Sequence, residues 1–303
     1  MRVIKIFLLS VVGLGIIVFI ILTILLSPVN NDSPEATDFV VTAGTSRSEI
    51  ANQLASAGLI KSSFAFYLYS RVIGGKILPG VYEISASDSG SMIAEKLAEG
   101  KFKTAKIVLI EGWRATDIED YLVNDRKLAQ LTGFADKAEG YEGYLFPDTY
   151  EVKFDITVDE LITLLRDNFT QRTKDIKINP EIVILASIVE REAKADDERA
   201  AIAGVYANRI KIGMRLEADP TIQYAKGDWK AVTLAEYRSV ISPYNTYLND
   251  GLPPGPICNP GLKSLEAAVS PETSSYLFFF HAKGQTFFSK TLEEHRTKVK
   301  QNF

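Results

Sequence analysis

The sequence predicts an α+β protein that follows one N-terminal transmembrane helix. Three observations predict it: an uncharged apolar run at residues 6–26, an alternation of strand-like runs and short capped helices up to about residue 125, and longer capped helices beyond. With 303 residues, of which 46% are hydrophobic and 24% charged, the chain can bury at least one large core and is not a disordered protein. We expect two globular parts.

The apolar run follows Arg2 and Lys5 and is long enough to cross a hydrocarbon core as a helix. It exceeds a usual signal-peptide core and no A-x-A-like site follows it, which favours an anchor over a cleaved signal. Because basic residues precede the run and none occurs from residue 27 to 46, we expect a cytoplasmic N-terminus and an extracytoplasmic remainder. The expected parts are a cytoplasmic stub (1–5), a transmembrane helix (6–26), a polar tether (27–38), a first globular region (39–125) and a second one (126–303).

The charge and the residue counts exclude several classes of partner. The net charge of −4 comes from 34 basic and 38 acidic residues without a long run of one sign, so nothing indicates a nucleic-acid partner. Cys258 is the one cysteine, which excludes an intrachain disulfide and a thiolate metal site. His281 and His295 have no ligand-like neighbours in the sequence. The sequence therefore predicts no metal and no cofactor.

One pattern recurs between residues 39 and 125. The segments GTSRSEIANQL (44–54), SDSGSMIAEKL (87–97) and GWRATDIEDYL (112–122) each combine a polar turn, a Ser or Thr placed to cap a helix, and Ile and Leu four residues apart. Strand-like runs lie at 39–42, 80–84 and 105–110. This order predicts small α+β units and resembles a LysM-like module, a fold that binds glycans containing N-acetylglucosamine. Coincidence is the alternative, because such Ile–Leu pairs occur in every amphipathic helix.

The second region has well-marked helix starts and predicts a mainly helical domain. Thr157 and Glu160 form a capping box, and Asn179 can cap a helix that begins with Pro180. A third helix is expected at about 197–211, and Asp219 and Pro220 can start a short fourth one. The segment YLFFFHAKGQTFFS (276–289) predicts a β-hairpin, because two apolar runs flank a glycine-containing loop.

Two glutamates, Glu190 and Glu192, end the apolar helix that begins at Pro180. They lie about 200° apart around a helix and so point to different faces. The Glu190 face carries small side chains at 186 and 187 and leaves room, whereas Leu, Ile and Val at 185, 188 and 189 lie above Glu192. We therefore expect Glu192 to pack and to pair with an arginine, and Glu190 to be the better candidate for chemistry. A salt bridge or a solvated helix end for both is the alternative.

Three further segments combine tyrosines, amides and rigid Pro/Gly turns: EGYLFPDTY (142–150), RLEADPTIQY (215–224) and SPYNTYLNDGLPPGPICNPG (242–261). Tyrosine rings suit the C–H faces of sugars, and amides suit their hydroxyl groups. Ordinary turn chemistry is the alternative for any one of them.

Taken together, LASIVERE, ANRIKIGMRLEADPTIQY and YNTYLNDGLPPGPICNPG, in this order behind one N-terminal span, closely resemble the YceG-like family of endolytic murein transglycosylases. The resemblance covers nearly the whole chain. It implies lytic cleavage of nascent peptidoglycan strands at MurNAc–GlcNAc bonds, which leaves 1,6-anhydroMurNAc ends and terminates strand elongation. It also implies that Glu190 is the catalytic acid/base and that Gln223, Tyr224, Asn245 and Tyr247 contact the substrate.

Lytic chemistry explains why one carboxylate suffices. A hydrolase needs a second carboxylate to act as nucleophile or to activate water, whereas in lytic cleavage the muramic acid's own C6 hydroxyl attacks C1. Glu190 must then start protonated, and burial beside Val183 and Ala186 would favour the neutral acid.

The resemblance also implies the location and the partners: a single-pass protein of the bacterial plasma (inner) membrane that acts on glycan strands and contacts membrane-bound polymerases (penicillin-binding proteins). Where an outer membrane exists, the catalytic part would be periplasmic. Two alternatives remain. One is a membrane-tethered, non-catalytic glycan-binding scaffold, and the other is a water-using glycosidase with Glu142, Glu192, Asp148 or Asp219 as second carboxylate.

Overall fold

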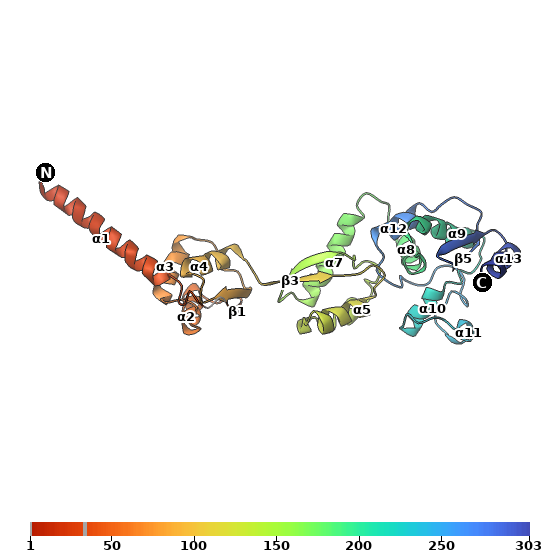
Figure 1. Cartoon of the computed structure of the whole chain (residues 1–303), viewed down its shortest axis with the longest axis horizontal. Coiled ribbons are helices and arrows are strands. Elements are labelled where there is room, and N and C mark those ends of the chain that lie inside the picture. The colour runs from red at the N-terminus through yellow and green to blue at the C-terminus, as the bar shows by residue number, and fades with distance from the viewer. Residues whose placement is uncertain (1, 33–34) are drawn as a thin grey trace. The chain divides into compact units, whose positions relative to one another are not determined.

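The computed structural model describes residues 2–32 and 35–303. These residues form two compact units, which Figure 1 shows coloured along the chain. Unit 1 comprises Met1–Ala105 and Glu151–Asp155, and unit 2 comprises Lys106–Tyr150 and Ile156–Phe303. Residues 106–125, which the sequence pattern grouped with the first globular region, thus belong to unit 2. Residues 33 and 34 of the expected tether lie outside the described residues.

The N-terminal helix α1 (Arg2–Leu26) contains the predicted span. Its stretch Ile4–Leu26 has a mean hydropathy of 3.0 and is not buried by the rest of the protein, which is consistent with a single-pass membrane anchor. The end of α1 lies against the globular part of unit 1: a Cβ added to Gly90 would come within 3.1 Å of Leu26. Beside this contact, the Lys61 ammonium donates a hydrogen bond to Ser27 (2.7 Å).

Unit 1 is a small α+β unit, as the sequence predicts. It contains, in order, β1 (Ala36–Val41), α2 (Arg47–Ser56), α3 (Ser63–Val72), β2 (Gly80–Ser85) and α4 (Gly90–Glu99). The two strands are antiparallel, with Val41 opposite Gly80. Ser46 and Ser89 cap α2 and α4, as predicted. Helix α3 was not predicted, because its run FAFYLY has neither a clear helical nor a clear strand periodicity.

The third repeat of the capping pattern begins unit 2 and differs from the prediction. It forms α5 (Ala115–Asp120) and continues into the π-helical turn η1 (Tyr121–Asp125). Thr116 lies inside α5 and does not cap it. Instead the Asp117 carboxylate accepts a hydrogen bond from the backbone N–H of Arg114 (2.9 Å), because an acidic side chain in the first turn can reach back to the cap position.

The remaining elements confirm a mainly helical second unit with a hairpin. Strands β3 (Thr104–Val108) and β4 (Thr149–Lys153) pair with each other, and each has residues in both units. In unit 2, β5 (Phe278–Ala282) and β6 (Gln285–Ser289) form the predicted antiparallel hairpin. The capping box at Thr157 and the Asn179 cap are both present. The other elements are η2 (Ala129–Leu131), α6 (Phe134–Lys137), α7 (Val158–Arg172), α8 (Pro180–Glu192), η3 (Asp196–Glu198), α9 (Arg199–Lys211), α10 (Asp219–Lys226), α11 (Glu236–Ser239), α12 (Leu262–Val269) and α13 (Leu292–Asn302).

Helix α8 lies at the centre of unit 2, where it packs against α9 and α12 (Figure 1). Every residue from 183 to 189 is buried, which is typical of a helix surrounded on all sides. On the face that the sequence left open, the segment 256–261 fills the space. The Ser187 hydroxyl accepts a hydrogen bond from the Ile257 N–H (3.0 Å), and the Cys258 thiol donates one to the Ser187 carbonyl (3.3 Å). The small side chains at 186 and 187 therefore make room for the backbone of another segment and not for a ligand. The prediction that this face is open is wrong.

Candidate active site

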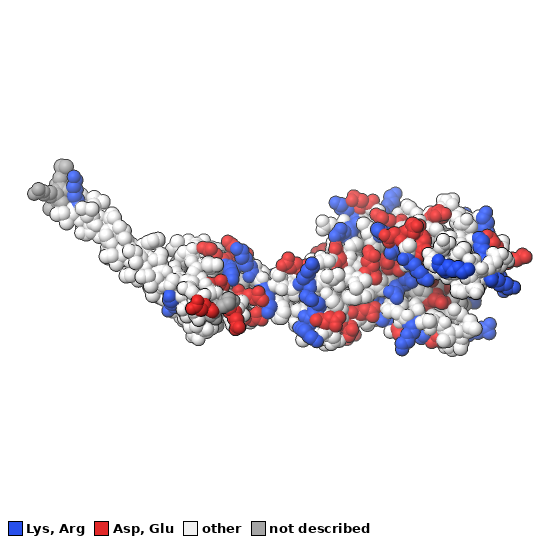
Figure 2. Space-filling model, in the orientation of Figure 1, with Lys and Arg blue, Asp and Glu red and all other residues white. Residues whose placement is uncertain are grey.

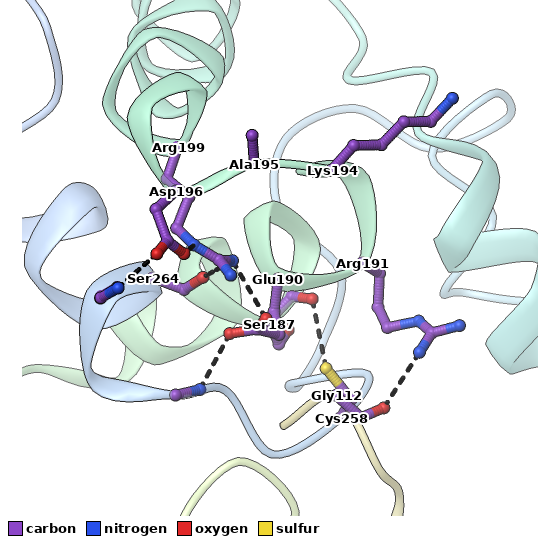
Figure 3. Close-up of polar contacts among 12 residues, drawn as sticks. Gly112, Ser187, Glu190, Arg191, Lys194, Ala195, Asp196, Arg199, Cys258 and Ser264 are labelled. Carbon is purple, nitrogen blue, oxygen red and sulfur yellow. Dashed lines mark hydrogen bonds and ion pairs between the residues drawn. The ribbon is translucent and has the colours of Figure 1, made fainter. Parts of the chain in front are cut away.

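Glu190 lies in the last turn of α8 with 6% of its side chain exposed, and both of its oxygens are engaged (Figure 3). Oε1 pairs with Nη1 of Arg199 at 3.0 Å, and Oε2 accepts a hydrogen bond from the Gly261 N–H at 2.9 Å. The sequence led us to expect apolar surroundings from Val183 and Ala186. The structure instead gives Glu190 a cation and a backbone donor, because α9 and the start of α12 meet the end of α8.

Arg199 is itself held on two other sides. Its Nη1 also donates to the Ser264 hydroxyl on α12 (2.8 Å), and its Nε pairs with Asp196 (3.3 Å). Asp196 is bound in turn by Lys263, and these two cations hold the pKa of the Asp196 carboxyl below its usual range. Because the guanidinium is planar and bonded to three elements, it fixes the orientation of the Glu190 carboxylate.

Glu192 has a partner that differs from the predicted one. The Tyr206 hydroxyl on α9 donates to Oε1 of Glu192 at 3.0 Å, so a tyrosine takes the place of the expected arginine. Burial raises the pKa of Glu192 to about 7. This pair lies between α8 and α9, which agrees with the packing role expected for Glu192.

Glu142, which is half-buried, forms a second carboxyl site in unit 2. Its Oε1 accepts a hydrogen bond from the Asn259 amide (2.7 Å), and both oxygens accept from the Ala115 N–H at the start of α5 (3.2 Å each). Burial raises the pKa of Glu142 to about 7. The side-chain oxygen Oδ1 of Asn259 also accepts hydrogen bonds from the N–H groups of Gly143 (2.8 Å) and Leu145 (3.0 Å). Asn259 therefore joins the segment 142–145 to the segment 256–261.

A cavity of about 760 Å³ opens beside Glu142. The rings of Tyr224 and Tyr244 line it with centroids 4.7 Å apart, and its other lining residues are neutral or acidic. The cavity reaches α8 at Pro180 and Ile184, and Glu190 does not line it. Because an α-helix rises about 1.5 Å per residue, Ile184 and Glu190 are separated by roughly 9 Å along the axis. The cavity and the Glu190 cluster thus lie at opposite ends of one helix.

The structure places one of the four predicted substrate contacts, Tyr224, in this cavity. Gln223 donates to the Lys230 carbonyl (2.9 Å), and Asn245 is fully buried and donates to the Val240 carbonyl (2.8 Å). The Tyr247 hydroxyl donates to Asp219 (2.7 Å). These three side chains hold the loops that follow α10 and that precede the proline-rich segment.

The other carboxylates considered from the sequence have their own partners. Asp148 pairs with Arg172 and accepts from Asn168 (3.2 Å), and Asp219 accepts from Tyr247. Sequence reasoning missed Arg199 and Asn259. Asn259 lies in the proline-rich segment 242–261, to which the sequence assigned no individual role for this residue, and nothing in the local sequence relates Arg199 to Glu190.

Charged side chains of both signs occur together on unit 1 and unit 2 (Figure 2). Figure 2 shows Lys and Arg interspersed with Asp and Glu over the visible face. Within residues 2–32 and 35–303, no group of three or more His, Cys, Asp or Glu side chains is placed to hold a metal ion.

Known proteins match this chain over nearly its whole length. Residues 39–301 match the YceG-like family. An endolytic murein transglycosylase of Bacillus subtilis is 32% identical over 317 residues, which cover 92% of this chain and 88% of that protein. One of Streptococcus pneumoniae is 27% identical over 329 residues, which cover 90% of this chain but 60% of that protein. The crystal structure of a yceG-like protein from Listeria monocytogenes has a TM-score of 0.55 and 32% identity and covers 87% of this chain and 99% of its own. The chain therefore belongs to the YceG-like family.

Proposed function

We propose that this protein is an endolytic murein transglycosylase that cleaves nascent glycan strands at MurNAc–GlcNAc bonds and leaves 1,6-anhydroMurNAc ends. The observation that carries the proposal is Glu190, oriented by Arg199 and Gly261 at the end of a buried helix, in a family whose curated relatives bear this name.

In the proposed reaction Glu190 acts first as acid and then as base. It gives its proton to the glycosidic oxygen, and the bond from that oxygen to C1 breaks. The C6 hydroxyl oxygen then bonds to C1, and its proton returns to Glu190. One carboxyl group thus carries out both proton transfers, and no water is consumed. Arg199 keeps this group directed at the reacting bond.

The cavity beside Glu142, at the other end of α8 from Glu190, supports a separate contact with sugar rings of the glycan strand. The paired rings of Tyr224 and Tyr244 offer apolar faces to sugar rings, and the Glu142 carboxyl can accept or donate a hydrogen bond, since its pKa is about 7. In unit 1 the β1-α2-α3-β2 order supports a LysM-like, glycan-binding role.

The apolar helix α1 supports an anchor that restricts the enzyme to glycan near its own membrane. New strands are polymerised there, so cleavage at this place would terminate their elongation. Membrane-bound polymerases are then the expected protein partners.

The test is product analysis of purified glycan strands after incubation with the full chain in detergent. The wild type is compared with Glu190→Gln and with Glu181→Gln, which removes an exposed carboxylate from the first turn of the same helix. We expect anhydro-ended fragments from the wild type and from Glu181→Gln, and a loss of about 10²- to 10⁴-fold for Glu190→Gln. Reducing-ended fragments would instead indicate a water-using glycosidase. Binding without cleavage by all three proteins would indicate a scaffold.

A further inference from the structure

A second carboxylate, that of Glu111, lies directly beside the Glu190 cluster. Glu111 follows β3 and reaches Gly261, whose N–H donates to Glu190. A Cβ on Gly261 would overlap the Glu111 carboxylate. Since Gly261 has φ −74° and ψ 169°, its backbone conformation does not require glycine. Glycine at position 261 therefore allows the Glu111 carboxylate to lie against the backbone at this point.

The residue after Glu111 approaches Glu190 from another direction. A Cβ on Gly112 would lie 3.6 Å from Cγ of Glu190, and the Gly112 N–H donates to the Asn259 carbonyl (2.9 Å). The backbone at 111–112 therefore runs beside both Glu190 and the segment 259–261. Two independent contacts, at Gly112 and at Gly261, thus place the two carboxylates next to each other.

The charged groups around this pair come from four elements. Arg199 pairs with Glu190, and Lys263 binds Asp196. Arg191 turns its guanidinium to the Gly112 carbonyl and to the ring of Trp229 (3.9 Å to the centroid), and the buried thiol of Cys258 donates to the Ser187 carbonyl. Although Glu111 is exposed to solvent, desolvation where it lies against the protein and the charge of Glu190 raise its pKa, while Arg199 and Lys263 act in the opposite direction.

We propose that Glu111 and Glu190 form a carboxyl pair that holds one proton, and that Glu111 is a positioning residue that keeps this proton available to Glu190. Two adjacent carboxylates repel each other when both are ionised, so the singly protonated pair is favoured. The inference rests on the proposed lytic function. One proton leaves the pair for the glycosidic oxygen, and one returns from the C6 hydroxyl.

A first experiment follows ionisation without catalysis. In the full chain, labelled with ¹⁵N-glycine and held in detergent micelles, the Gly261 amide resonance reports on Glu190, to which it donates. We expect its titration midpoint to fall by about one pH unit or more in Glu111→Gln, because loss of the neighbouring charge makes ionisation of Glu190 easier. Glu266→Gln removes an exposed carboxylate from α12 and should leave the midpoint unchanged. Equal midpoints in the wild type and Glu111→Gln would overturn the proposal.

A second experiment measures the pH profile of kcat/KM for release of anhydro-ended fragments. In Glu111→Gln, the decline of kcat/KM at alkaline pH should begin about one pH unit lower than in the wild type. At a pH within this decline, the activity of the variant is then about tenfold lower. Glu111→Asp keeps the charge and should retain most of the wild-type profile, which separates charge from a folding defect. A shifted Gly261 titration in a protein that makes no anhydro product would retain the carboxyl pair and reject the lytic function. An unshifted Gly261 titration in a protein that makes the normal anhydro product would reject the carboxyl pair and retain the lytic function.

Discussion

At the scale of single residues, Glu190 depends on a partner outside the motif that identified it. Arg199 lies on the next helix, with 11% of its side chain exposed, and bonds Glu190, Ser264 and Asp196 together. A buried carboxylate without its cation is costly, so the two side chains are expected to be energetically coupled.

Replacing this arginine tests the coupling. Arg199→Gln should destabilise the protein by about 3 kcal/mol, and by clearly less in a Glu190→Gln background, because no charge is then left unpaired. Thermal unfolding of the two single variants and the double variant measures this. The more exposed pair of Arg172 and Asp148 gives a control, for which Arg172→Gln should cost about 1 kcal/mol or less. Additive effects of Arg199→Gln and Glu190→Gln would contradict the coupling.

Glu142 gives the stability a pH dependence of known sign. Burial raises its pKa to about 7, above the ordinary value of 4.5 that applies in the unfolded chain. The protonated form is thus favoured by folding, so its contribution is complete below pH 4.5 and is lost as the pH rises through 7. Between pH 5 and pH 8 the wild type should lose roughly 2 kcal/mol more than Glu142→Gln. Unfolding curves at the two pH values measure the difference, and parallel behaviour of the two proteins would show that Glu142 does not titrate in this range.

At the scale of elements, the position of α8 depends on how closely two loops approach it. The segments 142–145 and 256–261 both lie against this helix and are tied to each other by Asn259. Gly143 is at the point of closest approach: an added Cβ would come within 2.6 Å of Pro256 and 2.8 Å of Val183.

A pair of glycine variants separates this packing from backbone strain. Gly140 and Gly143 both have φ +87°, but a Cβ on Gly140 meets nothing within 4 Å. Gly140→Ala should cost about 1 kcal/mol, the strain of a left-handed residue. Gly143→Ala should cost about 1–3 kcal/mol more through overpacking and should reduce activity, since the loop that carries Glu142 must move. Thermal unfolding and product release check both predictions. Equal losses of stability in the two variants would mean that the residues around Gly143 rearrange to accept the added Cβ without a loss of stability.

At the scale of the whole molecule, α1 is the feature that bears on where the enzyme works. A helix with a mean hydropathy of 3.0 over Ile4–Leu26 fits a hydrocarbon core, and Ser27, directly after α1, accepts a hydrogen bond from Lys61. With basic residues before the span, we expect units 1 and 2 outside the cytoplasm.

Cysteine labelling tests this topology. Burial raises the pKa of the Cys258 thiol well above its usual value, so this thiol should not react in the folded protein. Asn31→Cys places an exposed thiol just after α1. A membrane-impermeant maleimide should label it in intact cells, or in spheroplasts where an outer membrane exists. Labelling that requires disruption of the plasma membrane would place the globular units in the cytoplasm.

The sequence by itself determined those features that local physics encodes. The apolar span of α1, the caps at Ser46, Ser89, Thr157 and Asn179, and the hairpin at 276–289 each follow from composition or periodicity within a short segment. The preference for Glu190 over Glu192 came from the family motif and from an argument about an open helix face that the structure does not bear out, so the catalytic role of Glu190 stays a prediction.

Tertiary structure alone decided the partners of these residues. It placed Arg199 and Gly261 on Glu190, Tyr206 on Glu192, Asn259 on Glu142, and the backbone of 256–261 on the face that looked open. The physical reason is that such contacts join segments that are far apart in the sequence, by more than 100 residues for Glu142 and Asn259. Helical periodicity identifies the face on which a side chain lies, but the packing of other segments against that face determines what the side chain meets.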